Sequence, residues 1–150
     1  PVTITTPEMT RFLLSLGEAV DTIFAAVRYA SRGETYIPRV PSAKVTDIAA
    51  TLIGDRPIKM TVTGIRPGEK IHEILVSEEE AHRTIPRGKY YVIQPILPEL
   101  RGEVDFGHTL DAEYSSADNL MIREELRGEL HRHGLLIEDL ETDNKGELIR

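Results

Sequence analysis

The sequence contains no cysteine, which excludes disulfide bonds and thiolate metal sites and fits a reducing compartment. No apolar run approaches the roughly 18 residues of a membrane-spanning helix, and no signal peptide is visible. We therefore expect a cytoplasmic protein without a membrane partner. Because the first residue is Pro1 rather than methionine, we also expect the chain to be a segment of a longer protein.

Positive charge is scarce as well. The formal net charge is −7 and the isoelectric point is near 5.3, which argues against nucleic acid as a main partner. A glycine-rich turn of the kind that binds dinucleotides is missing, because no two glycines lie two or three residues apart. The sequence thus predicts no cofactor-binding residues, although two or three local cations suffice to bind a phosphate.

The composition that remains is that of a globular domain, with 40% apolar and 29% charged residues in a chain of 150. Strand and helix patterns alternate over residues 1–76 and predict an α/β fold. Strands are expected at 2–5, 34–38, 59–63 and 89–94. Helices are expected from a capping box at Ser15 and Glu18 to Gly33, at 44–53 with Gly54 as the C-cap, and at 69–76 and 122–130. Residues 98–118 are predicted to form a long surface loop, and residues 138–150 an acidic tail that frays.

The most informative stretch is Gly-Ile-Arg-Pro-Gly-Glu-Lys at residues 64–70. Arg66-Pro67-Gly68-Glu69 has the chemistry of a type II turn, because proline presets φ at the second position and glycine supplies a positive φ at the third. Arg66 offers a planar fork of donors that matches a phosphate. Glu69 can accept hydrogen bonds from sugar hydroxyls. We expect the turn to lead into the helix at 69–76, whose free amide groups would face an anion.

Four segments, in this order and spacing, carry a resemblance to a known family. They are Pro-Glu-Met-Thr-Arg-Phe (7–12), Val-Pro-Ser-x-Lys-x-Thr-Asp (40–47), Arg-Pro-Gly-Glu-Lys (66–70) and Tyr-Tyr-Val-Ile-Gln-Pro (90–95). Over most of residues 1–96 the chain resembles the C-terminal part of the extended short-chain dehydrogenase/reductases that act on nucleotide sugars. Within them it is most similar to inverting UDP-N-acetylglucosamine 4,6-dehydratases and capsular polysaccharide biosynthesis dehydratases. The run Glu-Tyr-Ser-Ser at 113–116 echoes the tail of that family.

The resemblance implies a division of the chain and a set of site residues. Residues 1–97 would be the substrate-binding portion, with mixed strands and helices, and residues 98–150 a C-terminal extension. Arg11 and Arg66 match the two family arginines that grip the diphosphate of a UDP-sugar, and Glu69 matches a residue that meets the ribose. The fold would lack the N-terminal nucleotide-binding half, which in the family holds NAD or NADP.

The resemblance also implies what this chain cannot do alone. The family's Tyr-x-x-x-Lys pair is absent, since no tyrosine here is followed four positions later by lysine. We therefore expect no catalytic residues and no turnover from this chain alone. The expected partners are a UDP-sugar, the N-terminal half, against which apolar surface would pack, and further copies in a homo-oligomer.

Several alternatives stay open at this point. The chain can be a stand-alone, non-catalytic module for nucleotide or anion binding or for oligomerisation, or part of a UDP-sugar 4-epimerase that shares the diphosphate grip. Arg11 can instead pair with Glu8 or Glu18 on the surface. A metal site is not expected, because His131 and His133 are two positions apart and diverge on a helix.

Overall fold

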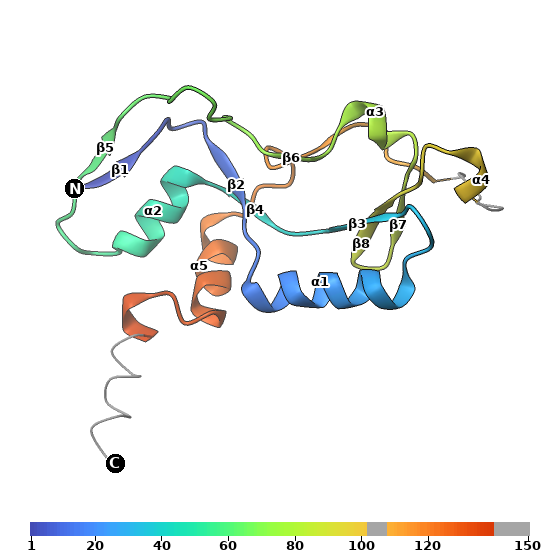
Figure 1. The fold of residues 1–150 in the computed structure, drawn as a ribbon. Helices are drawn as coiled ribbons and strands as arrows, with labels where there is room; N and C mark the ends of the chain where they lie inside the picture. Colours follow the sequence, from blue (N-terminus) through green and yellow to red (C-terminus); the bar gives the residue numbers. More distant parts are fainter. Residues whose placement is uncertain (102–107, 140–150) are drawn as a thin grey trace, which may run out of the picture.

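The computed structural model describes residues 1–101 and 108–139, which form a mixed α/β fold (Figure 1). Its strands are β1 (Val2–Ile4), β2 (Thr10–Phe12), β3 (Thr35–Pro38), β4 (Ser42–Lys44), β5 (Met60–Val62), β6 (Ile74–Val76), β7 (Thr84–Arg87), β8 (Tyr90–Ile93) and β9 (Tyr114–Ser115). Its helices are α1 (Leu16–Tyr29), α2 (Val45–Ile53), α3 (Glu78–Ala81), α4 (Pro98–Arg101) and α5 (Arg123–Arg132).

The elements gather into two lobes (Figure 1). One contains β1, β2, β4, β5, α2 and α5, and we call it the α2–α5 lobe. The other contains α1, β3, β7 and β8, and we call it the α1–hairpin lobe. The pair β6 and β9, which is antiparallel with an irregular register, lies between them.

The α2–α5 lobe is closed by helix packing. The parallel pair β1–β5 and the antiparallel pair β2–β4 lie beside α2, and α2 ends at Gly54, whose φ of +57° suits a residue without a side chain. The side chains at the centre of this lobe are buried and come from β4, α5 and the segment after α5. They are Ala43, Leu126, Leu130 and Leu136.

The α1–hairpin lobe is built on a three-stranded antiparallel sheet in the order β3-β8-β7. β7 and β8 form a hairpin in which Gly88, with a φ of +61°, takes the first of two loop positions. Its small core consists of Tyr36, Tyr90 and Val92 and is covered by alanines of α1.

An ion pair fixes β3 to the hairpin. Arg87 donates to both oxygens of Glu34, at 2.8 and 3.0 Å, and also to the hydroxyl of Tyr36 at 2.9 Å. Gln94 donates to the same carboxylate at 3.0 Å. The side chain of Glu34 is only 3% exposed. Burial raises the pKa of Glu34, but the hydrogen bonds from Arg87, Gln94 and the backbone outweigh it, so the pKa lies below its usual value.

The capping box predicted at the start of α1 is confirmed. Ser15 Oγ accepts a hydrogen bond from the amide of Glu18, and the Glu18 carboxylate accepts one from the amide of Ser15 at 2.9 Å. The hydrogen bonds from the Ser15 hydroxyl and amide hold the pKa of Glu18 below its usual value. Both helix caps that depend on local chemistry, Ser15 and Gly54, thus follow the sequence prediction.

The helix predicted at 69–76 is wrong. Residues 70–73 are irregular, and Ile74–Val76 is strand β6, paired with β9. Isoleucine and valine favour a strand over a helix, and the partner strand at Tyr114–Ser115 lies far away in the sequence. The turn at Arg66 therefore does not present a helix N-terminus to a ligand.

Four strands besides β6 were not predicted. β2 precedes the capping box at Ser15, β4 directly precedes α2, β7 precedes the predicted strand at 89–94, and β9 lies in the predicted loop at 98–118. Part of that loop, residues 102–107, lies outside the described residues, as does the tail at 140–150. The described start of the tail is held by Arg127, which pairs with Glu138 at 2.7 Å.

Candidate functional site

Arg11, on β2, lies at a junction with residues 70–73. Its Nη1 donates to the carbonyl oxygens of Thr10 at 2.7 Å and Ile71 at 3.2 Å, and its Nη2 donates to the carbonyl of Lys70 at 3.1 Å. The guanidinium therefore holds the segment after the Arg-Pro-Gly turn against β2.

Glu73 supplies the counter-charge of Arg11. Its carboxylate lies 3.6 Å from Arg11 Nε, and both side chains are partly exposed. Because water screens such a pair, it contributes little to stability. The alternative partners of Arg11, Glu8 and Glu18, are not used in this way: Arg11 pairs with Glu73, and Glu18 caps α1.

The type II turn predicted from Arg66-Pro67-Gly68-Glu69 is confirmed. The amide of Glu69 donates to the carbonyl of Arg66 at 3.1 Å, and Gly68 has a φ of +86°. The Glu69 carboxylate accepts a hydrogen bond from the Arg66 amide at 3.0 Å and so closes the turn a second time. Arg66 itself is exposed.

Arg66 and Glu69 share the turn, and Arg11, on β2, donates to the carbonyls of the next two residues, Lys70 and Ile71. The guanidinium of Arg11 already faces the carboxylate of Glu73. An anion here would compete with Glu73 for Arg11, whereas the side chain of Arg66 projects from an exposed turn.

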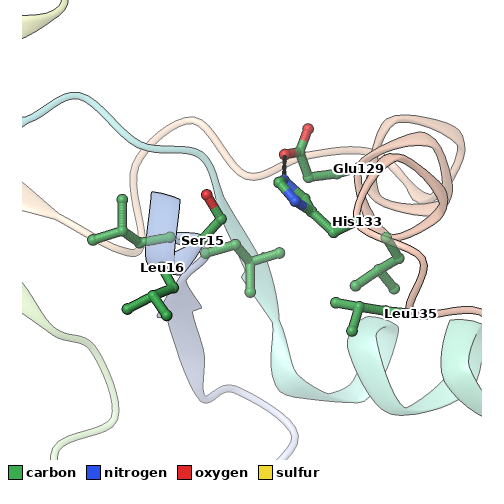
Figure 2. Close-up of a pocket in the computed structure, with 8 residues that line it drawn as sticks. Ser15, Leu16, Glu129, His133 and Leu135 are labelled. Atoms are coloured by element: carbon green, nitrogen blue, oxygen red, sulfur yellow. Dashed lines mark hydrogen bonds and ion pairs between the residues drawn. The ribbon is translucent and has the colours of Figure 1, made fainter. Parts of the chain in front are cut away.

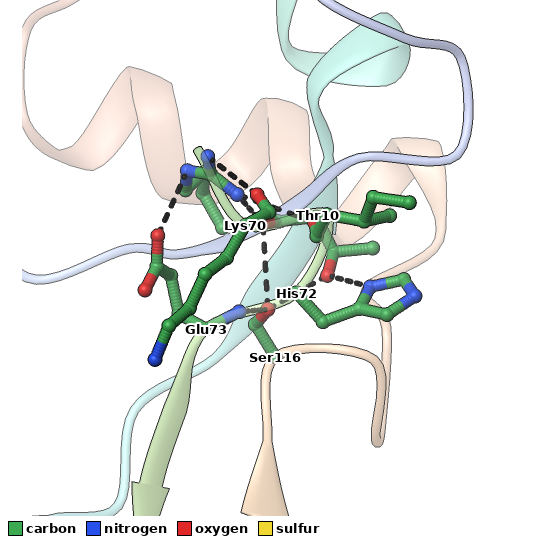
Figure 3. Close-up of polar contacts among 7 residues, drawn as sticks. Thr10, Lys70, His72, Glu73 and Ser116 are labelled. Atoms are coloured by element: carbon green, nitrogen blue, oxygen red, sulfur yellow. Dashed lines mark hydrogen bonds and ion pairs between the residues drawn. The ribbon is translucent and has the colours of Figure 1, made fainter. Parts of the chain in front are cut away.

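A buried hydroxyl network beneath Arg11 was not predicted from the sequence. Thr10 Oγ1 lies 2.8 Å from His72 Nδ1 and 2.7 Å from Ser116 Oγ, and Ser116 Oγ accepts a hydrogen bond from the Glu73 amide at 2.9 Å (Figure 3). Thr10 and Ser116 are both buried. The network ties β2, residues 72–73 and the segment after β9 together. Two of its members lie in segments that the sequence singled out, Thr10 in Pro-Glu-Met-Thr-Arg-Phe (7–12) and Ser116 in Glu-Tyr-Ser-Ser (113–116).

A second polar contact fixes β9 to the connection between β3 and β4. The hydroxyl of Tyr114 accepts from the Val40 amide at 3.0 Å and donates to the Val40 carbonyl at 2.8 Å. Burial raises the pKa of Tyr114. Tyr91 packs edge-on against Tyr114 and carries the guanidinium of Arg39 over its ring at 4.9 Å, while Tyr90 is buried. Tyr90 and Tyr91 thus lie on opposite faces of β8.

The start of α1 does not have the features of a dinucleotide site. A helix that a dinucleotide approaches needs open amides after a glycine-rich turn. At the start of α1 the amides of Ser15 and Glu18 are bonded to each other's side chains. Within residues 1–101 and 108–139, no group of three histidine or carboxylate side chains is placed to hold a metal ion.

Comparison with known proteins supplies the family. The polysaccharide biosynthesis protein family matches residues 1–95, which is more than half of the chain. This chain belongs to that family. It is 38% identical over 103 residues to the inverting UDP-N-acetylglucosamine 4,6-dehydratase of Campylobacter jejuni, covering 69% of this chain and 30% of that enzyme.

The chain is also similar to a UDP-glucose 4-epimerase and to a solved structure. UDP-glucose 4-epimerase of Rickettsia bellii is 38% identical over 94 residues, covering 61% of this chain and 28% of the epimerase. The X-ray structure of Pen from Bacillus thuringiensis superposes with a TM-score of 0.78 at 27% identity, covering 90% of this chain and 42% of that chain. The match thus spans under a third of the length of the Campylobacter jejuni dehydratase and of the Rickettsia bellii epimerase. No helix in the described part of the chain is long and apolar enough to cross a membrane.

Proposed function

We propose that this chain forms the UDP-sugar-binding portion of a nucleotide-sugar 4,6-dehydratase that works in bacterial surface polysaccharide or glycan biosynthesis. The observation that carries the proposal is the junction at Arg11, which holds the segment that follows the Arg66 turn. The similarity to the inverting dehydratase of Campylobacter jejuni supports it.

In this proposal Arg66 and Arg11 share the two negative charges of the diphosphate. Arg66 approaches from the exposed turn with its donor fork available to a phosphate. Arg11 turns from Glu73 toward the ligand or binds it with its remaining N–H. Glu69, at the end of the turn, accepts from the ribose. Binding of the remote UDP group would position the sugar for a reaction carried out elsewhere in the enzyme.

The proposal includes NAD or NADP only as the cofactor of the whole dehydratase, not as a ligand of this chain. The sequence has neither a glycine-rich turn nor a Tyr-x-x-x-Lys pair, and the chain's own side chains cap the start of α1. The proposal therefore assigns substrate binding to this chain and assigns both cofactor binding and catalysis to a portion of the enzyme that it does not contain.

The test replaces Arg66 with alanine in the complete gene product and measures the affinity for UDP by calorimetry. Loss of a charged hydrogen bond worth about 1.5–3 kcal/mol should weaken binding by roughly tenfold to a hundredfold. Arg28→Ala, which removes an exposed arginine from α1, is the matched control and should leave the affinity unchanged. Equal affinities of the two variants would contradict the proposal.

A UDP-sugar 4-epimerase is the second candidate, favoured by the 38% identity to the Rickettsia bellii enzyme. Incubation of the gene product with UDP-N-acetylglucosamine and analysis of the sugar separates the two. A 4-keto-6-deoxy sugar supports the dehydratase, and a sugar inverted at C4 supports the epimerase. Binding of UDP without conversion of any UDP-sugar would instead favour the stand-alone binding module.

A further inference from the structure

Residues 114–118 form a tight turn that is bonded to distant parts of the chain. The hydroxyl of Tyr114, at its start, binds both the amide and the carbonyl of Val40. Asp118, at its end, accepts from the Ser115 amide at 3.0 Å and donates its own amide to the Ser115 carbonyl at 3.0 Å. Ser116 lies inside this turn and is completely buried. The turn lies beyond residue 95, where the family match ends.

Ser116 binds the backbone of Glu73 on both sides. The Ser116 amide donates to the Glu73 carbonyl at 2.8 Å, and Ser116 Oγ accepts from the Glu73 amide at 2.9 Å. One residue thus fixes the two peptide groups that flank Glu73. Because the Glu73 carboxylate is the counter-charge of Arg11, Ser116 also determines where that counter-charge lies.

The same hydroxyl reaches Arg11 through Thr10. Ser116 Oγ lies 3.3 Å from the Thr10 carbonyl, and Arg11 Nη1 donates to that carbonyl at 2.7 Å. All contacts of the network are satisfied when Ser116 Oγ donates to the carbonyl, the Thr10 hydroxyl donates to Ser116 Oγ, and His72 Nδ1 donates to the Thr10 hydroxyl. A single carbonyl oxygen therefore joins the buried serine to the guanidinium.

The apolar pocket at the start of α1 does not compete for the same anion. It has a volume of about 310 Å³ and is lined mainly by leucines, and no arginine or lysine is among its lining residues. Figure 2 shows Leu16 on one side of this pocket and Leu135 on the other, with His133 bonded to Glu129. A diphosphate needs charged donors, which the junction at Arg11 provides and this pocket does not.

We infer that Ser116 is a positioning residue of the diphosphate site, and that the turn at 114–118 is part of this site. The inference rests on the proposed function and extends it to the part of the chain beyond residue 97. Ser116 holds Thr10 and Glu73, and through them it holds Arg11 in place before the ligand arrives. A group that is ordered in advance loses less conformational freedom on binding.

Calorimetry of UDP with the complete gene product tests the inference at a temperature well below the Tm of every variant. Ser116→Ala should weaken UDP binding about threefold to tenfold, which is the effect of one neutral hydrogen bond on a binding equilibrium. The matched control is Ser42→Ala. Ser42 is equally buried, and its hydroxyl donates to the Asp118 carbonyl at 2.9 Å, in the same turn. It should lower the Tm and leave UDP affinity unchanged. Equal UDP affinities of the two variants would overturn the inference.

A double-mutant cycle shows whether Ser116 acts through Arg11. In an Arg11→Ala background, Ser116→Ala should not weaken UDP binding further, because the group that it positions is gone. An undiminished effect of Ser116→Ala in that background would overturn the inference.

Thr10 gives an independent readout. Thr10→Val removes the hydroxyl at a similar side-chain shape and should weaken UDP binding as Ser116→Ala does, whereas Thr10→Ser keeps the hydroxyl and should retain the affinity. Wild-type affinity of Thr10→Val would overturn the inference. Arg66→Ala separates the two levels of the argument. If it leaves UDP affinity unchanged, the proposed function fails; if it weakens UDP binding and Ser116→Ala does not, only the role of Ser116 fails.

Discussion

The two lobes contain amphipathic helices that are used in opposite ways. In the α2–α5 lobe, α2 buries Ala49, Thr51 and Ile53, and the core is closed by α5. In the α1–hairpin lobe, α1 has a similar apolar periodicity, and yet it buries none of its residues. The core of that lobe is small and depends on an ion pair as well as on apolar packing.

The difference shows that two properties are separate: which side chains share the apolar face of a helix, and whether another element covers that face. The pattern of α1 sets which side chains share a face, and a capping box sets where the helix begins. Neither determines which element covers that face. The α2–α5 lobe is therefore expected to respond to mutation as a closed core does, and the α1–hairpin lobe to respond mainly through its polar contacts.

The largest effect is expected in the closed core. Leu126 is completely buried in the α2–α5 lobe, and Leu126→Ala should lower the free energy of unfolding by about 2–5 kcal/mol because it leaves a cavity. Urea unfolding measures the loss. The control is Ile122→Ala at the start of the same helix, where the side chain is exposed and the loss should stay within about 0.5 kcal/mol. Similar losses for both variants would show that α5 does not close this core.

In the α1–hairpin lobe the corresponding weak point is Arg87. Arg87→Gln leaves the buried carboxylate of Glu34 without its charged partner. Removing one partner of a fully buried pair costs about 3–5 kcal/mol. Because Arg87 is 41% exposed, we expect a smaller loss of about 2 kcal/mol in the free energy of unfolding.

The control for Arg87 is Lys89→Gln on the same hairpin. Lys89 lies 4.0 Å from Asp21, and both side chains are about two-thirds exposed. An exposed pair of this kind contributes at most about 1 kcal/mol. If Lys89→Gln destabilised the protein as much as Arg87→Gln, burial of Glu34 would not explain the effect.

The same carboxylate makes the α1–hairpin lobe sensitive to acid. The pKa of Glu34 lies below its usual value of 4.5 in the folded protein, so the folded state binds this proton less readily than the unfolded state. The stability that the ionised Glu34 contributes is complete above the unfolded pKa and is lost as the pH falls through the folded one. Tm measured from pH 6 to pH 3 should therefore fall more steeply for the wild type than for Glu34→Gln. Parallel curves would contradict this.

Local chemistry explains which parts of the fold were predictable. The Ser15 cap, the Gly54 end of α2 and the type II turn at Arg66 each depend on residues within four positions, and all three were correct. The helix predicted at 69–76 is wrong because residues 74–76 pair as a strand with β9, which lies about 40 residues further along the chain. A local pattern of apolar residues does not distinguish a short helix from a strand whose partner is distant.

The same distinction between local and distant contacts applies to the candidate site. The sequence singled out Arg11, Arg66 and Glu69, and in the structure Arg11, on β2, binds the segment that follows the other two. The buried contacts of Thr10 with His72 and Ser116 could not be predicted, because hydroxyl groups carry no periodic signal and the two partners lie 62 and 106 positions away.

The smallest effect tests how far α1 depends on its own cap. Ser15→Ala removes the hydroxyl that accepts from the Glu18 amide and should lower the free energy of unfolding by about 1 kcal/mol. Ser31→Ala, beyond the other end of the helix, is the control and should change little. Because the Ser15 hydroxyl and amide also hold the pKa of Glu18 low, the cost of Ser15→Ala should shrink as the pH falls and Glu18 becomes protonated. A cost that stays constant from pH 6 to pH 3 would mean that the Ser15 hydroxyl stabilises the helix through the Glu18 amide alone, independently of the Glu18 charge.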